Sequence, residues 1–462
     1  MSMAEAATKI RLEVEGDVAA QLDGQSRICN WLYNHLLERA NNLRAQYRHT
    51  QDPEIGGLLY SKRGLRNLLP QIKEENPFIK VVHSSPLKNA ALRVSDSIRR
   101  HQDARHGRRK GGPVGWPRFR SWRHSGWFSL LYDEPNKGFR IHGEQLTLSL
   151  GKDRNNQQRY VVVRAPGVQK ALKGKTVNNL RIVKQQGVFY AVFGVDRPVP
   201  KPKEINHAIV LDPNHKNLAY GVDSEGNAVS IETPWWLKIL DRRADELQAK
   251  RDRCCKHSVR VPVLDADAQE TGRHYWRPSK RWMRYDKALQ RVLAKRREQS
   301  KTYLATVANR LYRHYDWVVI GDYTPKGNGI TTAMRRAMSN RSVIGQFKDT
   351  LSWTALKSGK QFSVFQEHRT TRTCSECGHA VEGGIAPGVD EWDCPCCGAH
   401  HLRDENAARN GWAVFLREQK QNNGGFQPPV PRSGPAAVRQ RWTWRVRPSG
   451  IYSRGSGWAC DA

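Results

Sequence analysis

The spacing of apolar and polar residues changes several times along the first half of the chain. Residues 8–14, TKIRLEV, alternate as a strand does, whereas residues 25–105 follow the period of a helix. Residues 127–200 contain short alternating runs separated by Gly, Asn and Asp, and these predict a small antiparallel barrel or sandwich. Residues 198–204 are polar and rich in proline, which is typical of a linker.

The second half predicts strands and helices in mixed order. The run HAIVLD predicts a short buried strand, and NLAYGVD and AVSIE predict two more strands of a meander. Two long basic helical patterns, the strand DWVVIGDY, a helix near residues 343–357 and the strand QFSVFQE follow. A cysteine-rich segment then precedes the amphipathic pattern RDENAARNGWAVFLRE. This is the order of an RNase H-like fold, in which carboxylates at neighbouring strand ends and on a late helix bind Mg²⁺.

From about Asn422 onward, the chain becomes rich in glycine and proline. Such a composition supplies too little apolar surface for a packed core. We therefore expect a disordered basic tail.

The charge of the chain points to a polyanionic partner. Lys and Arg number 77 against 44 acidic residues, so the net charge is +33. Such a surface repels itself unless an anion neutralises it. Nucleic acid is the natural partner, and the binding would weaken steeply with salt.

Residues 99–124 concentrate this charge, with nine Lys or Arg, one acid and three aromatic residues between them. Guanidinium groups suit phosphates, and aromatic rings offer stacking faces for unpaired bases. The segment therefore predicts nucleic-acid contacts, although a solvated basic loop would have the same composition. The candidate residues are Arg108, Arg109, Lys110, Trp116, Arg118 and Arg120.

Two cysteine pairs have the spacing of metal ligands. Cys374 and Cys377 form one CxxC pair, and CPCC follows after sixteen residues. Four thiolates give a closed tetrahedral site, so we expect a structural zinc ribbon held by Cys374, Cys377, Cys394 and Cys397. Cys396 could replace Cys397, although the CxxC spacing favours Cys397.

The remaining cysteines do not indicate a secreted protein. Nine cysteines in a large basic chain are an odd, clustered set rather than a disulfide framework. The opening MSMAEAATKIRLEVEG has no long apolar run, so it predicts neither a signal peptide nor a membrane span. We expect a reducing compartment, which is the cytoplasm or nucleoid of a prokaryote or the nucleus of a eukaryote.

Five segments together resemble one family. VLDPNHKNLAYGVD, WVVIGDY, TRTCSECGH, WDCPCCG and HLRDENAARNG, in this order, resemble TnpB proteins. These are transposon-encoded RNA-guided DNA nucleases, related to Fanzor proteins and to type V CRISPR effectors. The resemblance covers residues 205–417 well and the first half more loosely, through GWPRFRSW among other segments.

The resemblance implies the activity, partners and architecture. The activity is Mg²⁺-dependent endonuclease cleavage of double-stranded DNA with a guide RNA derived from a transposon end. The architecture is a multidomain α/β chain with an RNase H-like (RuvC) nuclease core, an inserted zinc ribbon, a β-barrel wedge domain and a helical recognition lobe. The expected parts are the wedge barrel (1–24 and 111–203), the recognition lobe (25–110), the nuclease core (204–370), the zinc ribbon (371–400), the final nuclease helix (401–420) and the disordered tail (421–462).

Two acids match the family's catalytic positions. Asp212 ends the first nuclease strand, and Asp404 lies in the last helix. A turn former before Pro213 and a helix-start acid are the structural alternatives. The usual middle Glu is replaced by Gly321, and we expect Asp322 to point to the opposite face because side chains alternate along a strand.

Glu367 is the candidate replacement. It ends the strand QFSVFQE, which in this fold lies parallel and next to the strand ending at Gly321. The ends of parallel neighbours open on one edge of a sheet. Fanzor proteins and some TnpB proteins resemble this chain in placing the acid here. A surface Glu paired with Arg369 or Arg372 is the structural alternative.

Three hypotheses follow. The first is an RNA-guided endonuclease whose Mg²⁺ ligands are Asp212, Glu367 and Asp404. The second is a nuclease-dead, repressor-like protein that binds DNA with a guide RNA. The third is a zinc-ribbon RNA or DNA chaperone with a remnant core. The role of Glu367 separates the first two.

Overall fold

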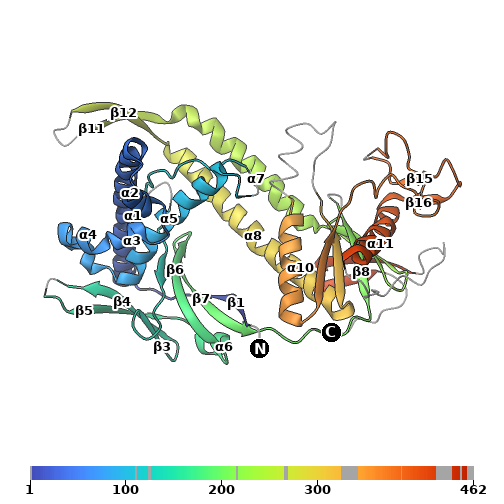
Figure 1. The fold of residues 1–462 in the computed structure, drawn as a ribbon, viewed down its shortest axis with the longest axis horizontal. Coiled ribbons are helices and arrows are strands. Elements are labelled where there is room, and N and C mark those ends of the chain that lie inside the picture. Colours follow the sequence, from blue (N-terminus) through green and yellow to red (C-terminus); the bar gives the residue numbers. More distant parts are fainter. Residues whose placement is uncertain are drawn as a thin grey trace. The chain divides into compact units, whose positions relative to one another are not determined.

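The computed structural model describes residues 3–109, 112–122, 126–153, 155–214, 217–264, 269–323, 342–386, 388–422, 440–447 and 450–454. The chain divides into two compact units, Met1–Pro198 and Val199–Ala462 (Figure 1). No helix in the described part of the chain has an apolar stretch long enough to cross a bilayer.

The first unit combines a helical part with two antiparallel sheets. Its helices are α1 (Gly16–Thr50), α2 (Pro53–Tyr60), α3 (Gly64–Asn67), α4 (Leu69–Glu75), the 3₁₀ helix η1 (Pro77–Val81), α5 (Ser84–Arg105) and α6 (Val168–Leu172). Its strands are β1 (Met3–Arg11), β2 (Leu130–Tyr132), β3 (Phe139–His142), β4 (Gln145–Lys152), β5 (Gln158–Arg164), β6 (Thr176–Gln185) and β7 (Val188–Pro198). Their order is β1-β7-β6-β2 in one sheet and β3-β4-β5 in the other.

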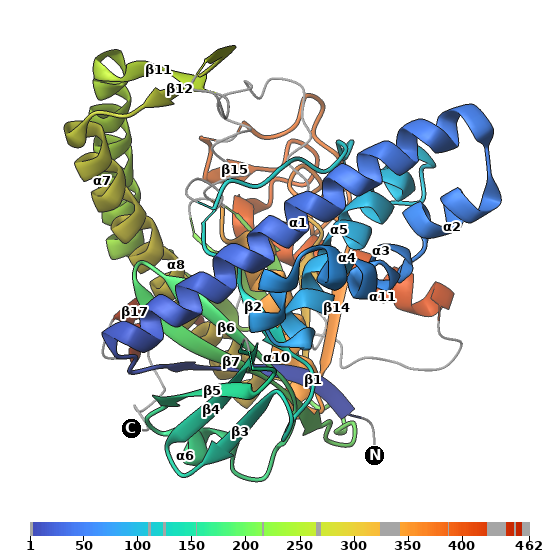
Figure 2. The ribbon, with the colours of Figure 1, turned by 90° about the vertical axis from the view of Figure 1, so that its left-hand side faces the viewer.

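One continuous core joins these elements. Leu22, Leu32 and Leu36 of α1 are fully buried, and so is Phe193 of β7. The long helix α1 crosses this unit beside α5 (Figure 2). The helical and strand patterns of the first half are thus parts of one packed body.

The second unit is built on a seven-stranded mixed sheet. Its strands are β8 (Ala208–Pro213), β9 (Ala219–Asp223), β10 (Ala228–Ile231), β13 (Trp317–Gly321), β14 (Gln361–Phe365), β17 (Arg441–Arg447) and β18 (Gly450–Arg454), in the order β14-β13-β8-β9-β10-β17-β18. β13 runs parallel to both β8 and β14, whereas β8, β9 and β10 form an antiparallel meander.

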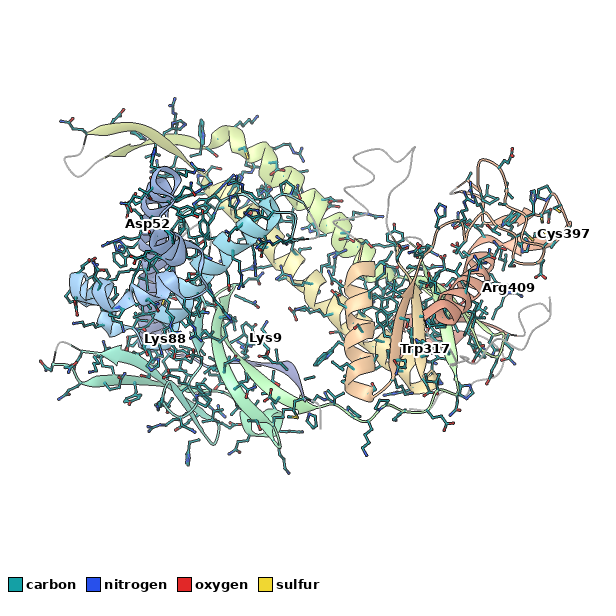
Figure 3. The ribbon with its side chains drawn as sticks, in the orientation of Figure 1. Lys9, Asp52, Lys88, Trp317, Cys397 and Arg409 are labelled. Atoms are coloured by element: carbon teal, nitrogen blue, oxygen red, sulfur yellow. The ribbon has the colours of Figure 1, made fainter. Side chains whose placement is uncertain are left out.

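Helices cover both faces of this sheet. They are α7 (Trp235–Arg253), α8 (Lys280–His314) and α10 (Ile344–Ser358) on one side and α11 (Arg403–Asn422) on the other. Trp317 packs edge-on against Phe415 of α11, with ring centroids 4.9 Å apart (Figure 3). A Cβ at Gly411 would lie 2.7 Å from the Phe365 ring, so this glycine lets α11 approach the sheet closely.

Five smaller elements lie in the described part of the second unit. The 3₁₀ helix η2 (Cys254–His257) and the hairpin of β11 (Val259–Leu264) and β12 (Glu270–Arg277) lie between α7 and α8. The short strands β15 (Glu391–Asp393) and β16 (His400–Leu402) pair within the cysteine-rich segment.

The prediction of a disordered tail over residues 421–462 is wrong in two places. α11 continues to Asn422, and β17 and β18 add two strands to the sheet. The segment RWTWRVR alternates, so Trp442, Trp444 and Val446 are buried while Arg441 and Arg445 are exposed. This period of two is a strand signal that the glycine and proline content of the preceding residues obscures.

Candidate carboxylate site and cysteine cluster

The strand register brings Asp212, Gly321 and Phe365 to neighbouring positions at one edge of the sheet. Ile320 pairs with Leu211, and Gly321 pairs with Phe365. Alternation places Ala208 and Val210 on the face covered by α11, and Asp212 follows them on that face. The same alternation on β14 leads from Phe365 to Glu367.

The carboxylate of Glu367 lies over the Cα of Gly321. A Cβ built at Gly321 would overlap the end of the Glu367 side chain, 2.5 Å from its carboxylate carbon. Real Cβ atoms essentially never approach another atom that closely. The missing side chain on β13 therefore leaves the space that Glu367 of the neighbouring strand end occupies.

Asp212 lies within the field of the two other candidate acids. Its side chain is buried, and burial raises its pKa well above the ordinary value. The negative charges of Glu367 and Asp404 raise that pKa further, and the Arg403 guanidinium opposes them. The charges of Glu367 and Asp404 are thus close enough to act on Asp212. The three acids come from three elements: Asp212 from β8, Glu367 from the end of β14 and Asp404 from α11.

Glu367 is also perturbed. Burial, and then the charge of Asp322, raise its pKa to about 7, while Lys348 and the backbone N–H of Tyr323 act in the opposite direction. Its Oε1 atom is buried and accepts no hydrogen bond from the described residues. A buried carboxylate oxygen without a partner is costly unless a cation or water completes it.

Asp404 is held by both of its oxygens in the first turn of α11. Asn214 donates to Oδ2 at 2.9 Å, and Arg403 donates to Oδ1 at 3.2 Å. The Asn214 contact ties the residues that follow β8 to the start of α11. Asp404 is therefore positioned relative to Asp212 by a direct hydrogen bond between their elements.

The oxygens of these three residues are hard ligands of the kind that Mg²⁺ prefers. The Oε1 atom of Glu367, which has no partner within the described ranges, and the repulsion between Asp212 and the two other acids also fit a site completed by a cation. Asp322 is exposed, and its Oδ1 accepts the backbone N–H of Glu367 at 3.2 Å.

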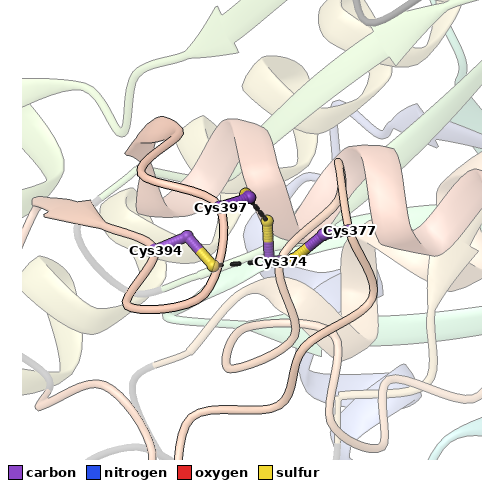
Figure 4. A group of neighbouring side chains, drawn as sticks. All are labelled: Cys374, Cys377, Cys394 and Cys397. Atoms are coloured by element: carbon purple, nitrogen blue, oxygen red, sulfur yellow. Dashed lines mark hydrogen bonds between the residues drawn. The ribbon is translucent and has the colours of Figure 1, made fainter.

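The four predicted zinc ligands form a compact cluster (Figure 4). One ligand atom from each of Cys374, Cys377, Cys394 and Cys397 lies within 4.8 Å of all the others. Cys396 is exposed and lies outside the group, so the open choice of register falls on Cys397. Within the described ranges this is the one group of at least three such ligands, and the carboxylates do not form a second.

Two similar turns build the cysteine cluster. Gly378 donates its backbone N–H to the carbonyl of Cys374, and Gly398 donates to Cys394, each at 2.9 Å. Both glycines have positive φ, at 75° and 71°, a conformation that other residues rarely adopt. The backbone N–H of Cys397 lowers the pKa of the Cys394 thiol to about 6, which favours the thiolate that binds metal.

The first turn of the cluster docks onto α11. Asn406 accepts the N–H of Ser375 at 2.8 Å and donates to the Thr373 carbonyl at 2.8 Å. Asn410 donates to the same carbonyl at 2.6 Å, and His401 Nε2 lies 3.0 Å from Cys374 Sγ. The sequence reasoning missed these contacts, although the spacing of four between the asparagines places them on one face of a helix.

The predicted nucleic-acid residues of the first unit are placed differently from one another. Trp116 is half-buried, donates to Asn41 Oδ1 at 2.8 Å, and has the Arg44 guanidinium 4.0 Å from its ring centroid. Arg120 lies over the Phe128 ring. These two residues pack within the first unit.

The other basic candidates are exposed. Arg108, Arg109 and Arg118 have exposed side chains, whereas Lys110 lies outside the described residues. Their contact with nucleic acid stays a prediction.

Comparison with known proteins supports the resemblance. Residues 345–411 match the family model Cas12f1-like, TNB domain. A Streptomyces pristinaespiralis protein named "Putative RNA-guided DNA endonuclease" is 30% identical over 152 residues, which are 32% of this chain and 37% of that protein. The TnpB-like protein L79 of Acanthamoeba polyphaga mimivirus is 27% identical over 145 residues, 30% of this chain and 27% of that protein. The matched parts thus span well under half the length of these relatives.

Among solved structures, a Cas12f1–sgRNA–target DNA complex aligns with 88% of this chain and 98% of that chain, at 11% identity and a TM-score of 0.46. The predicted resemblance to TnpB-like proteins is confirmed by the sequence matches.

Proposed function

We propose that this chain is an RNA-guided DNA endonuclease in which Asp212, Glu367 and Asp404 bind Mg²⁺. The observation that carries the proposal is the position of Glu367 over Gly321, with a buried oxygen that has no hydrogen-bond partner among the residues that the structure describes. A surface glutamate paired with arginine would have neither property.

The architecture supports a nuclease core. The central β8, its meander with β9 and β10, and the parallel strands β13 and β14 form the strand order of an RNase H-like (RuvC) sheet. The two sheets and helices of the first unit then correspond to a wedge domain and a recognition lobe. Guide RNA and target DNA as partners are supported by the similarity to TnpB-like proteins and by the net charge of +33.

The position of each of the three acids supports a role in this proposed site. Asp212 is fixed by the sheet, and Glu367 reaches the same face from the adjacent strand end, where Gly321 gives it room. Asp404 is oriented by Asn214 and Arg403. These three carboxylates would hold Mg²⁺, which would supply an activated water and neutralise charge on the phosphodiester.

The cysteine cluster would stabilise this site through the helix that carries Asp404. Four thiolates leave no open position for substrate, so the proposed zinc is structural. Its first turn is bonded to Asn406 and Asn410 on the helix that carries Asp404. Folding of the ribbon thereby positions one of the catalytic acids.

The test is cleavage by Glu367→Gln with the RNA that co-purifies as guide. The substitution keeps the size of the side chain and removes its charge. Mutating a residue that only supports a metal ligand lowers activity by up to about 100-fold. Loss of a ligand should therefore lower the rate of cleavage in Mg²⁺ by more than this. Binding of guide and target should persist. Glu382→Gln, the same change at an exposed ribbon residue, is the matched control and should cleave normally.

Normal cleavage by Glu367→Gln would refute the assignment of this acid. A wild-type protein that binds a guided target and never cuts it in Mg²⁺ or Mn²⁺ would instead support a nuclease-dead DNA-binding protein. That alternative remains open because the usual glutamate position is Gly321.

A further inference from the structure

The β11–β12 hairpin projects from the far end of the α7–α8 helix pair (Figures 1 and 2). The two helices pack through Ala244, Leu247 and Leu289. In the hairpin, Val259 pairs with Arg277, and Arg260 pairs with Trp276. This insertion is far along the helices from the sheet edge that carries the acids.

Aromatic side chains lie on both faces of this hairpin. Directly opposed residues in an antiparallel pair share a face, so Tyr275 shares one with Val261 while Trp276 shares the other with Arg260. Trp276 is 60% exposed and Tyr275 is 48% exposed. Every described side chain of the two strands is exposed, apart from the half-buried Val261.

A two-stranded hairpin of this kind has no core of its own. Isolated hairpins are marginally stable in water, and these exposed rings bury little surface within the hairpin. The fold of the second unit does not need these rings, because neither of them contributes to a buried cluster in the described part of that unit. A partner that covers the rings would account for both the insertion and its composition.

Basic side chains gather at the base of the hairpin, although residues 259–277 as a whole carry three arginines and three acids. Lys256, Arg277 and Lys280 are exposed at this base, and Glu270 is exposed at the start of β12. Arg260 Nη2 lies 3.0 Å from Nδ1 of His274, and the His274 ring lies edge-on to Trp276 with centroids 6.1 Å apart. A guanidinium thus lies opposite an exposed indole in the strand pairing, and an imidazole is its hydrogen-bond neighbour among the described residues.

An aromatic ring next to a guanidinium has the groups needed to bind an unpaired nucleotide. The ring stacks on the base and the guanidinium binds the adjacent phosphate, a combination used by proteins that bind single strands. A duplex would offer the phosphates but keep its bases stacked inside. Phosphate binding alone would leave the aromatic residues without a role.

We propose that the β11–β12 hairpin binds an unpaired nucleic-acid strand, with Trp276 and Tyr275 stacking on bases and Arg260 and Arg277 contacting phosphates. The proposal rests on the proposed function for the presence of a nucleic-acid partner. Unpaired guide RNA and a displaced DNA strand share this chemistry.

The experiment measures binding of full-length protein to single-stranded RNA, to single-stranded DNA and to duplex DNA, each containing the fluorescent base 2-aminopurine. Trp276→Leu removes the aromatic face but keeps apolar bulk, whereas Trp276→Phe keeps a ring. We expect about tenfold weaker binding and loss of 2-aminopurine quenching for Trp276→Leu. Trp276→Phe should stay close to wild type.

The two single-stranded probes identify the source of the strand. A larger loss on RNA assigns the hairpin to the guide, and a larger loss on DNA assigns it to a displaced target strand. Replacing Arg260 and Arg277 together by Gln should reduce the salt dependence of binding to a single strand by about 1.4 units of log–log slope.

Trp235→Leu is the matched control, since this tryptophan is 65% exposed at the start of α7. Equal losses for Trp235→Leu and Trp276→Leu, or equal losses on single strands and duplex, would overturn the proposal. Unchanged binding by Trp276→Leu would overturn it too, and a wild-type dimer that this variant separates would then assign the hairpin to a protein contact.

The outcome is separable from that of the proposed function. Should wild-type protein fail to cleave any guided target while Trp276→Leu still loses single-strand binding, the nuclease assignment fails and the hairpin assignment stands. Should Glu367→Gln abolish cleavage while Trp276→Leu binds single strands normally, the hairpin assignment fails and the nuclease assignment stands.

Discussion

The cysteine cluster and the carboxylate edge are both groups of metal-binding side chains, yet they are assembled differently. The four cysteines come from one segment, and two glycine turns bring their sulfur atoms within 4.8 Å of one another. The acids come from three elements, and repulsion with burial raises the pKa of Asp212 and Glu367. A preformed closed site suits a resident structural ion, whereas a strained open site suits an ion that arrives with substrate.

The largest expected effect comes from removing a ligand of the cysteine cluster. Cys374→Ser should remove zinc and unfold the ribbon, because zinc binding contributes about 10–16 kcal/mol in small zinc domains. Cleavage should then fall, since the turn bonded to Asn406 and Asn410 is lost. Metal analysis should give one zinc per wild-type chain and less in the variant.

Cys396→Ser is the matched control for this experiment, because Cys396 is exposed and lies outside the cluster. It should retain zinc and activity. Loss of zinc from Cys396→Ser together with retention in Cys397→Ser would show that the structure has the wrong register.

The second prediction concerns the space above Gly321. Gly321→Ala introduces no charge, yet its Cβ would overlap the Glu367 carboxylate and displace it. Misplacing a catalytic group by about 1 Å can cost about 100-fold, and we expect a loss of cleavage of that order. Steady cleavage rates with guide and target held constant provide the measurement.

Gly345→Ala is its control, since a Cβ there would meet nothing within 4 Å. The combined change of Gly321→Glu with Glu367→Gly returns the acid to β13 and should recover part of the activity. Wild-type cleavage by Gly321→Ala would mean that the carboxylate position is not used.

The third prediction concerns the carboxylate site and the way in which the stability of the protein depends on pH. The folded pKa of Glu367 is raised from 4.5 to about 7, so folding favours its protonated form. In metal-free buffer the protein should therefore lose up to about 3 kcal/mol of stability as pH rises from about 4.5 to about 7. Below about pH 4.5 the carboxyl group of Glu367 is protonated in both the folded and the unfolded protein, so it does not lower the free energy of unfolding.

Glu367→Gln should flatten this pH dependence and be the more stable protein at pH 8 when metal is absent. Its uncharged side chain also relieves the repulsion that raises the pKa of Asp212. Denaturant unfolding at several pH values would measure the difference. Added Mg²⁺ should stabilise wild type more than the variant, and equal stabilisation would argue against Glu367 as a ligand.

The smallest effect belongs to Asp322. Its side chain is exposed and accepts the backbone N–H of Glu367, an interaction that Asp322→Asn retains. Cleavage should stay within about twofold of wild type. A loss as large as that of Glu367→Gln would identify Asp322 as the middle acid instead.

The strand ends and cysteines could be predicted because their signals are local. The apolar run before Asp212 and the two CxxC pairs each fix a short segment without reference to the rest of the chain. The choice between Cys396 and Cys397 needed the fold, because both residues satisfy a plausible spacing and only the turn at Gly398 decides between them.

Other features depend on tertiary packing that no local pattern contains. Trp116 and Arg120 have the composition of a nucleic-acid loop, yet their hydrogen bonds and stacking partners lie on α1 and beside it. Gly321 and Glu367 are 46 positions apart, and their closeness was expected only because the resemblance supplied the pairing of β13 with β14. The β11–β12 hairpin was missed because the strong helical periods on both sides dominate its short alternation.

The pairing of β17 with β10 also determines what a shortened chain would look like. β10 is hydrogen-bonded on both sides, to β9 and to β17. A protein ending after α11 would leave the backbone N–H and C=O groups of Ala228–Ile231 open along a bare flank and would uncover Trp442's and Trp444's hydrophobic neighbours. Such flanks recruit strands from other molecules, so a minimal version trimmed at residue 422 should self-associate and precipitate even with every proposed catalytic acid in place.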